Sequence, residues 1–323
     1  MSAVRKPTAE GTLAALQSLQ ELGLLMTPLL PVTIAGVNCF AKAESLQPIG
    51  AFKIRGAWWR LTNLSEDEAR QGVVAVSSGN HAQGVAWAAK RLGIKATIVM
   101  PRDAPPVKLD ATRELGAEIV LYERPGEDRD EVAARVLEER GGTLVHAFGD
   151  PWVIEGQGST AHEANAQMGF RRTPSRFVVC CGGGGLAAGL ALANPVAAIH
   201  IVEPEGWDVV GRSLAAGEIV RVGDNAPKTI CDALQPDATK AINLGVLSGR
   251  AEPGVSVTDA EVRTAQRFAF AKLRLVLEPG GAAALAAALA GKVPLDENTV
   301  IMLTGGNTDA ARFAAMLTEG HGV

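Results

Sequence analysis

The sequence predicts an α/β protein with two lobes, each containing a largely parallel sheet flanked by helices. Short apolar runs alternate with segments of helical periodicity along most of the 323 residues, a pattern typical of βα units on parallel sheets. With 47% hydrophobic residues the chain can bury more than one ordinary core. No repeat of solenoid length and no low-complexity linker divides it, so we expect the lobes to share a broad interface.

The strand candidates are short apolar runs rich in β-branched residues. They are VVAVS from Val73, ATIVMP from Ala96, EIVLY from Glu118, TLVHA from Thr143, RFVVCC from Arg176, AIHIVE from Ala198 and TVIMLTG from Thr299. Helical periodicity predicts helices over GVAWAAKRLG after Gly84, DEVAARVLEER from Asp130, TAHEANAQMG from Thr160 and NTDAARFAAML from Asn307. In EGQGSTAHE (155–163) we expect a glycine turn that starts a helix, and in the irregular segment 224–245 a loop across the cleft.

Composition excludes several classes of protein. The formal charge is −4 and no basic run occurs, so the electrostatic footprint of a nucleic-acid binder is missing. The N-terminus lacks a signal-peptide core, and the apolar run 281–291 is too short to cross a bilayer, so we expect a cytoplasmic protein without a membrane partner. Cys39, Cys180, Cys181 and Cys231 lack metal-ligand spacing and are interpreted as free buried thiols.

Lys53 is the first candidate catalytic residue. In the segment ESLQPIGAFKIRGA (44–57), a turn precedes an amphipathic helix, which places Lys53 in the first helical turn. The helix dipole and the neighbouring Arg55 both disfavour an ammonium there, so its pKa should fall below the ordinary value of about 10.4 and free the amine as nucleophile and base. By helical position alone, however, a solvated lysine is the commoner interpretation.

Two loops at the carboxyl ends of predicted strands are suited to anions. The loop SSGNHAQG (77–84) offers successive N–H groups at a helix start, which can hold a carboxylate. The four glycines 182–185 open a helix near Leu186 and bring backbone amides close to a phosphate, each bond contributing about 1.5–3 kcal/mol. From spacing alone, 77–84 and TGGN (304–307) also fit ordinary strand-to-helix turns.

The glycine run has a second interpretation. Gly183-x-Gly185-x-x-Ala188 fits the dinucleotide fingerprint, and Glu203 ends the next strand where a ribose-binding acid would stand. An NAD-dependent oxidoreductase is therefore an alternative function. It leaves the lysine segment and the loop 77–84 unexplained, and the fingerprint usually lies in the first βαβ unit. A catalytically idle small-molecule sensor on the same fold is a third possibility.

Together these segments resemble a known family. S-x-Q-P-x-G-A-F-K-x-R-G-A, SSGNHAQG, the tetraglycine loop and TGGN resemble, in order, the motifs of fold-type II pyridoxal-phosphate (PLP) enzymes, which have the tryptophan synthase β-like fold. The resemblance covers about residues 27 to 317. Ile54 after the lysine favours the serine/threonine dehydratase (threonine ammonia-lyase) and serine racemase branch, because sulfhydrylase-type relatives usually carry an acidic residue there. EPGGAA from Glu278 is similar to a segment that lines the family's pocket.

The resemblance implies site residues. Lys53 would hold the cofactor as a Schiff base and act as the base, while Ser78 would protonate the opposite face. The implied cofactor contacts are Phe52, Lys53, Asn80, Gly182, Gly183, Gly184, Gly185, Leu186, Glu278 and Thr304. The implied substrate contacts are Ser77, Ser78, Asn80 and His81. Thr304 would face the pyridine nitrogen, where a neutral hydroxyl leaves the ring a weaker electron sink and suits β-elimination. Glu203 resembles a ligand of the divalent-cation (Mg or Ca) site of serine racemases, although Val209 replaces a carboxylate there.

The function implied by the resemblance is elimination from L-threonine or L-serine to give a 2-oxo acid and ammonia, with some racemase activity. Which hydroxy amino acid is preferred stays open, because one methylene contributes only about 1–3 kcal/mol of discrimination. We predict a large PLP-binding domain from 1–71 and 150–323 and a small domain from 72–149. We expect no C-terminal regulatory domain, hence no allosteric control by isoleucine, and a homodimer that binds a small amino acid.

Overall fold

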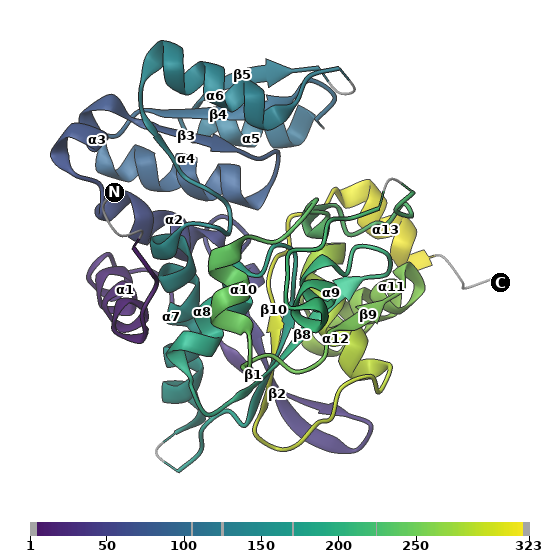
Figure 1. The fold of residues 1–323 in the computed structure, drawn as a ribbon. Helices are drawn as coiled ribbons and strands as arrows, with labels where there is room; N and C mark the ends of the chain where they lie inside the picture. The colour runs from purple at the N-terminus through teal and green to yellow at the C-terminus, as the bar shows by residue number, and fades with distance from the viewer. Residues whose placement is uncertain (1–4, 105, 124–125, 170, 224, 319–323) are drawn as a thin grey trace.

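The computed structural model of the chain has two lobes, each built on one β-sheet (Figure 1). It describes residues 5–104, 106–123, 126–169, 171–223 and 225–318. The larger sheet has the order β1 (Leu29–Ile34), β2 (Val37–Ala43), β10 (Thr299–Leu303), β7 (Arg176–Cys180), β8 (Ala198–Pro204) and β9 (Val255–Val257). The smaller sheet has the order β5 (Glu118–Tyr122), β4 (Ala96–Pro101), β3 (Val73–Val76) and β6 (Thr143–Leu144). β1 pairs antiparallel with β2 and the other strand pairs are parallel, which confirms the α/β class.

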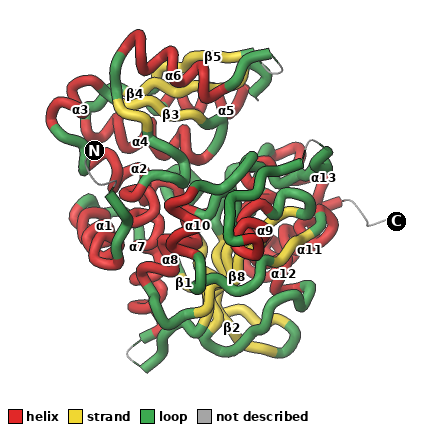
Figure 2. The backbone as a smooth tube through the Cα atoms, viewed as in Figure 1, coloured by secondary structure: helices red, strands yellow, loops and turns green. Residues whose placement is uncertain are grey.

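Helices cover both sheets. Those around the smaller sheet are α3 (Glu66–Gln71), α4 (Asn80–Leu92), α5 (Pro106–Glu114) and α6 (Arg129–Arg140). The others are α1 (Ala9–Glu21), α2 (Lys53–Thr62), α7 (Pro151–Met168), α8 (Gly185–Ala193), α9 (Val209–Ala216), α10 (Ala241–Leu247), α11 (Asp259–Phe268), α12 (Pro279–Leu289) and α13 (Ala310–Thr318). Short helical turns are η1 (Glu44–Leu46), η2 (Asp232–Leu234) and η3 (Ala269–Leu273). Loops, green in Figure 2, run along the side of the larger lobe that faces the smaller one.

Strand alternation divides the larger lobe into two cores. Val178 and Ile301 point into the core that contains the alanine-rich helix α12. Phe177 and Val300 point the other way, into the core formed with α7 and α8. Because both faces are covered, these strands are continuously apolar, as parallel strands usually are. No helix in the described part of the chain is long and apolar enough to cross a membrane.

The strand predictions hold with one correction and three omissions. The predictions at 73, 96, 118, 176, 198 and 299 correspond to β3, β4, β5, β7, β8 and β10. The strand predicted over 143–147 ends at Leu144, because after the bond from Val145 N to Val74 O (2.8 Å) the chain turns away from β3. The hairpin β1–β2 and the short strand β9 were not predicted.

Helix α7 corrects the expectation for 155–163. It begins at Pro151, with the Asp150 side chain as N-cap, and runs unbroken through the segment predicted to be a glycine turn. Its glycines serve close packing instead of a turn. A Cβ on Gly156 would lie 2.5 Å from the Cα of Gly56 in α2, and one on Gly158 would lie 2.5 Å from the carbonyl oxygen of Gly189 in α8.

Helix α2 lies at the junction of the lobes (Figure 1). It begins at Lys53, which therefore lies in the first helical turn, as predicted. The apolar face of this amphipathic helix is buried in the core of the smaller sheet and consists of Ile54, Ala57, Trp58 and Leu61. Gly56 on its other side contacts α7. This helix therefore packs against both lobes, and the domain limits at 71/72 and 149/150 stay a prediction.

The segment after residue 229 also connects the lobes. Lys108 of α5 forms an ion pair with Asp232 (Nζ to Oδ2 2.7 Å), and Arg129 of α6 forms one with Asp237 (Nη2 to Oδ2 3.4 Å). The described part of the segment up to residue 240 thus packs against the smaller lobe, as predicted, but 232–234 form the helical turn η2 and 241–245 belong to helix α10 instead of a loop.

We predict that Gly156→Ala lowers the thermal stability of the protein. The added methyl group would force α7 away from α2, and such overpacking costs about 1–3 kcal/mol. Gly245→Ala in α10 is the matched control, because Gly245 has no atom within 4 Å of the added Cβ and alanine favours a helix. Thermal unfolding followed by circular dichroism measures both, and equal melting temperatures for the two variants would contradict the helix-packing argument.

Candidate active site

Lys53 turns its amine into the junction between the lobes. Nζ donates to the carbonyl oxygen of Ala147 at 2.7 Å and lies 5.1 Å from the centre of the Phe52 ring. Burial lowers the pKa of the Lys53 amine from 10.5 to about 8. The predicted direction of this shift is confirmed, and the amine is far more nucleophilic near neutral pH than an exposed lysine.

The predicted contribution of Arg55 to this shift is wrong. Its guanidinium is fully buried and bonds to the carboxylates of Glu44 and Glu163, both at 2.7 Å. Two carboxylates therefore balance its charge, and burial alone lowers the pKa of Lys53. Sequence proximity suggested repulsion because it could not show that the two side chains leave the helix in different directions.

The turn TGGN lies against the turn that precedes Lys53. The N–H of Phe52 donates to the carbonyl oxygen of Thr304 (3.1 Å), and the N–H of Gly306 donates to that of Gly50 (2.9 Å). Thr304 is buried beside the thiol of Cys180. These backbone bonds hold the end of β10 next to the lysine turn, although more than 200 residues separate them.

A side-chain network joins Asn80 to the larger lobe. Asn80 donates through Nδ2 to Glu278 Oε1 (2.6 Å) and accepts through Oδ1 from Asn307 Nδ2 (2.8 Å). Asn307 also donates to the carbonyl oxygen of Ile49 (2.7 Å). Burial raises the pKa of Glu278 to about 7. The loops 77–84 and 304–307, which come from different sheets, are thus fixed to each other and to the N-cap of α12.

The glycine loop forms a backbone cradle. The carbonyl of Gly183 accepts from Thr239 Oγ1 (3.0 Å) and Asn243 Nδ2 (2.6 Å), so the N–H of the same planar peptide, on Gly184, points the opposite way. A Cβ on Gly183 would lie 2.3 Å from the ring of Phe148, which leaves no room for a side chain. Gly182 precedes the cradle, and Gly185 and the buried Leu186 begin α8 behind it. Amides at a helix start suit a phosphate.

In the loop 77–84, the ring of His81 is turned toward the smaller sheet. His81 Nε2 lies 2.8 Å from the carbonyl oxygen of Val145, and because a carbonyl only accepts, Nε2 carries the hydrogen. Burial lowers the pKa of His81 to about 3, so the ring is neutral and Nδ1 offers a lone pair. A carboxylate would therefore contact backbone N–H groups here. Ser77 Oγ accepts from Gly79 N (3.1 Å), and Ser78 is half-buried.

Sequence reasoning missed the segment 146–149 and the residues behind the glycine loop. His146 Nδ1 accepts from the N–H groups of Phe148 (3.3 Å) and Gly149 (2.9 Å), and burial lowers its pKa to about 4. This turn presents Ala147 to Lys53 and Phe148 to the glycines. Thr239 and Asn243 stand in irregular sequence, so no periodicity or motif could have indicated them.

Glu203 caps a helix. Its carboxylate accepts from the N–H groups of Val210 and Gly211 at the start of α9, both at 2.8 Å, and burial raises its pKa to about 8. Within the described ranges, no group of three or more His, Cys, Asp or Glu is placed to hold a metal ion. The residues present do not fit the suggested divalent cation.

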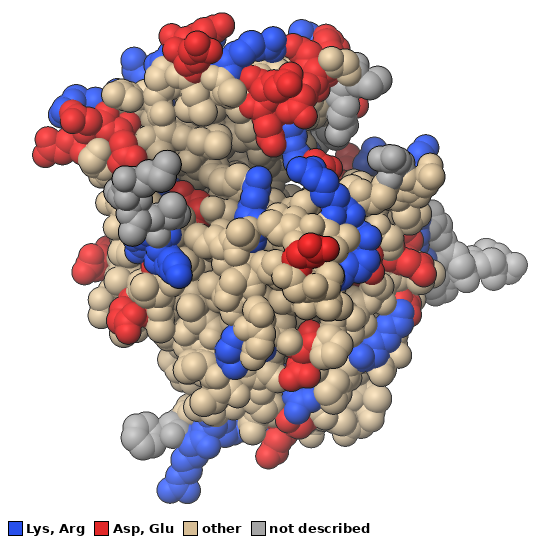
Figure 3. Space-filling view, viewed as in Figure 1, with Lys and Arg blue, Asp and Glu red and all other residues tan. Residues whose placement is uncertain are grey.

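The groups around the junction suit a phosphorylated aldehyde. A buried amine of low pKa can attack a carbonyl carbon, the glycine cradle can bind a phosphate, and Asn80 and Thr304 offer neutral hydrogen-bonding groups between them. Lysine and arginine side chains gather where the lobes meet on the face shown in Figure 3, which favours an anionic ligand. Such a site defines a class of enzyme that uses a carbonyl cofactor.

Comparison with known proteins identifies that class. Residues 21–305 match the family model described as pyridoxal-phosphate dependent enzyme, and the chain belongs to this family. It is 39% identical over 287 residues to an L-threo-3-hydroxyaspartate ammonia-lyase of a Pseudomonas species, covering 87% of this chain and 88% of the relative. It is similar to the structures of maize serine racemase (TM-score 0.89, 32% identity, 98% of each chain) and of a T.th. threonine deaminase (TM-score 0.85, 38% identity, 94% and 99%).

The oxidoreductase alternative is not supported. Membership of this family accounts for the lysine segment 44–57 and the loop 77–84, which a dinucleotide site leaves unexplained. In the structure, both carboxylate oxygens of Glu203 accept hydrogen bonds from backbone N–H groups at the start of α9. They are therefore not free to bind the hydroxyl groups of a ribose. The glycine loop opens the unit β7–α8–β8, which comes later in the chain than the parallel unit β3–α4–β4, whereas the fingerprint usually lies in the first βαβ unit.

We predict that Lys53 in cofactor-free protein reacts with acetic anhydride with a midpoint near pH 8. Only the neutral amine reacts, so the rate rises with pH through the lowered pKa, while an ordinary exposed lysine follows a value of about 10.4. Peptide mass spectrometry across pH 6 to about 11 measures both, with the exposed Lys95 as internal reference. Coincident curves for Lys53 and Lys95 would show that burial does not tune this amine.

Proposed function

We propose that the protein is a PLP-dependent ammonia-lyase that eliminates water from a small β-hydroxy amino acid, and that the released enamine takes up one water to give a 2-oxo acid and ammonia. The observation that carries the proposal is the buried Lys53 amine, with its pKa of about 8, beside Asn80, Thr304 and the glycine cradle. The similar proteins are named for 3-hydroxyaspartate, serine and threonine, which share a hydroxyl on the β-carbon.

The residues of the chain divide the work. PLP, when bound, delocalises the electron pair left on the substrate α-carbon. The glycine cradle would hold its phosphate, and Thr304 would offer its pyridine nitrogen a neutral hydroxyl. Lys53, partly neutral near pH 8, would take the α-proton, and the backbone N–H groups at 77–81 would hold the substrate carboxylate. A weak electron sink favours prompt loss of the β-hydroxyl over long-lived carbanions.

We infer that the protein works on a free amino acid in the cytoplasm and forms a homodimer. Its four cysteines are free and buried, which supports a reducing compartment. No helix among the described residues is suited to cross a membrane. Light scattering on the purified protein measures the assembly, and a monomeric mass would contradict the dimer.

We predict that Lys53→Ala abolishes turnover and covalent attachment of the cofactor. The variant lacks the amine that bonds the cofactor and takes the α-proton, so the rate of 2-oxo acid release from threonine, serine and 3-hydroxyaspartate should fall at least about a thousandfold, as general-base loss commonly costs 10²–10⁴. Borohydride reduction followed by peptide mapping should place the cofactor on Lys53 in the unaltered protein. A colourless unaltered protein that binds NAD would overturn the proposal.

We predict that Ser78→Ala abolishes racemisation but retains elimination. Racemisation needs a proton donor on the face opposite Lys53, whereas elimination needs only the base and a leaving group. Chiral chromatography of serine after incubation measures the first activity, and 2-oxo acid release measures the second. Equal loss of racemisation and elimination would show that Ser78 serves binding rather than proton return. Ser77→Ala is the matched control, because it removes the neighbouring hydroxyl without removing the predicted proton donor.

A further inference from the structure

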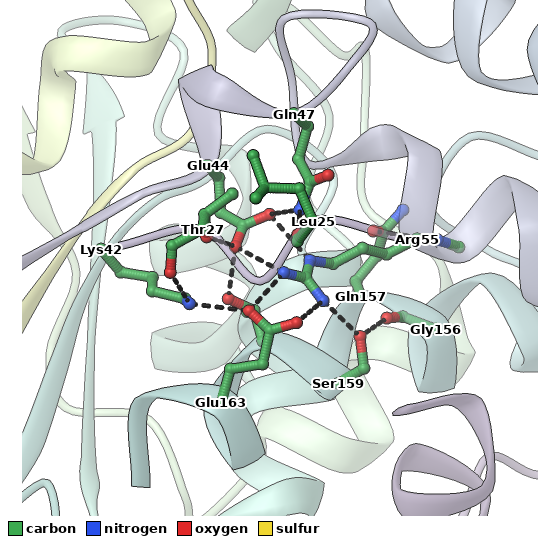
Figure 4. A network of polar contacts seen from close by, with 12 residues as sticks. Leu25, Thr27, Lys42, Glu44, Gln47, Arg55, Gly156, Gln157, Ser159 and Glu163 are labelled. Carbon is green, nitrogen blue, oxygen red and sulfur yellow. Dashed lines mark hydrogen bonds and ion pairs between the residues drawn. The ribbon is translucent and has the colours of Figure 1, made fainter. Parts of the chain in front are cut away.

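Four charged side chains form a buried network beneath the helix that carries Lys53 (Figure 4). Arg55 comes from α2, Lys42 from β2, Glu44 from η1 and Glu163 from α7. The side chain of Glu163 is 5% exposed and the other three are fully buried. Two positive and two negative charges balance, so the network is neutral when all four are ionised.

Every donor of Arg55 is used. Nε and Nη2 bond to the two oxygens of Glu44 (2.7 and 2.9 Å), and Nη1 and Nη2 bond to those of Glu163 (2.8 and 2.7 Å). The fifth N–H donates to Ser159 Oγ (3.2 Å). Burial would raise the pKa of Glu44, but Arg55, Lys42 and the hydrogen bond from Thr27 together outweigh it and hold the pKa at about 2. Two bidentate contacts fix the guanidinium plane in one orientation.

The lysine of the network is equally satisfied. Lys42 Nζ donates to the carbonyl oxygen of Thr27 (2.6 Å), to Glu163 Oε2 (2.7 Å) and to Gln167 Oε1 (2.9 Å). Glu44 Oε1 also accepts from Thr160 Oγ1 (2.8 Å). The contacts therefore join β2, η1, α2 and α7 through side chains that are removed from water.

Arg55 and Lys53 stand on different sides of the first turn of α2. Residues two apart on a helix project about 200° apart, which agrees with their partners: Lys53 reaches Ala147, and Arg55 reaches α7. On the side of α4, a Cβ on Gly84 would lie 3.1 Å from the carbonyl oxygen of Lys53. The backbone of Lys53 is therefore held between α4 and the anchored Arg55.

We infer that Arg55 is a positioning residue for the cofactor chemistry: its five hydrogen bonds to α7 and η1 fix the first turn of α2 and thereby the direction in which Lys53 presents its amine. This inference rests on the proposed function, because it names a residue that acts on that reaction only through Lys53. The Arg55 guanidinium itself is directed at α7 and η1, away from the amine.

Arg60 offers a matched comparison on the same helix. It is buried, donates through Nε to Asp150 Oδ2 (2.9 Å) and lies over the Trp152 ring at 4.5 Å. Arg60→Met removes the same charge and a buried ion pair from α2, but nearly two turns after Lys53. If the ion pairs serve only stability, both substitutions should lower activity equally. If Arg55 positions Lys53, only Arg55→Met should lower it.

The experiment compares Arg55→Met, Arg55→Lys and Arg60→Met below their melting temperatures. The first readout is the rate of covalent capture of pyridoxal phosphate by cofactor-free protein, followed by visible absorbance and borohydride trapping. The second is the rate of Lys53 acetylation by acetic anhydride without cofactor. The third is kcat and KM for threonine. We expect Arg55→Met to slow capture and lower kcat at least about tenfold, since small misplacements cost up to about a hundredfold.

The other outcomes are decisive as well. Arg60→Met should change capture and kcat less than twofold, on the order of experimental scatter, and Arg55→Lys should fall between the two. Equal losses in Arg55→Met and Arg60→Met would overturn the inference. If Arg55→Met does not fold, Arg55→Lys is compared with Arg60→Lys instead, and equal losses of capture and kcat in these two variants would overturn the inference. Lys53 acetylation needs no cofactor, so it tests the position of the amine even if the proposed function fails, which would appear instead as an unaltered protein without turnover.

Discussion

The buried charges around Arg55 impose the constraint on which the junction depends. Moving an ion out of water costs several kcal/mol, and attraction to a partner offsets this only when the remaining donors and acceptors are also satisfied. Arg55 and Lys42 meet this condition, since all their N–H groups are bonded. Removing one member would leave a buried charge unbalanced, at a cost of about 3–5 kcal/mol. Apolar contacts have no fixed direction, whereas these hydrogen bonds do. The network therefore fixes one arrangement of α2 against α7.

The same packing accounts for the chemistry of Lys53. Helix α2 buries its apolar face against α4 and its glycine against α7, so the half-buried lysine at its start is largely shielded from water. Removal from water disfavours the ammonium and lowers the pKa of the amine to about 8. The packing of the other side chains of α2 offsets the unfavourable free energy of burying this amine. A lysine on a helix free to move would regain water and lose its reactivity.

The sequence predicted the components of the site better than their contacts. Apolar periodicity predicted β4 and placed Lys53 in the first turn of α2, because most side chains of β4 and of the apolar face of α2 are buried by a neighbouring layer. Periodicity could not predict that α7 passes unbroken through Gly156, since a glycine marks a turn or a close approach equally well. Nor could it predict that Arg55 faces α7, or that Asn243 supports the glycine loop, because both depend on segments that meet only in the folded chain.

Parallel sheets explain why residues so distant in sequence converge on Lys53. The loops at 77, 182 and 304 each follow the carboxyl end of a parallel strand, where open α/β sheets bind their ligands. β7 and β10 are neighbours in the larger sheet. The hydrogen bond between Asn80 and Glu278 joins the loop at 77, which comes from the smaller sheet, to the larger lobe. Among the predicted site residues other than Lys53, Thr304 is a hydroxyl, His81 is neutral, and burial raises the pKa of Glu278 to about 7. These side chains supply little charge to stabilise a carbanion, which agrees with the proposed reaction, in which a leaving group removes the electron pair at once.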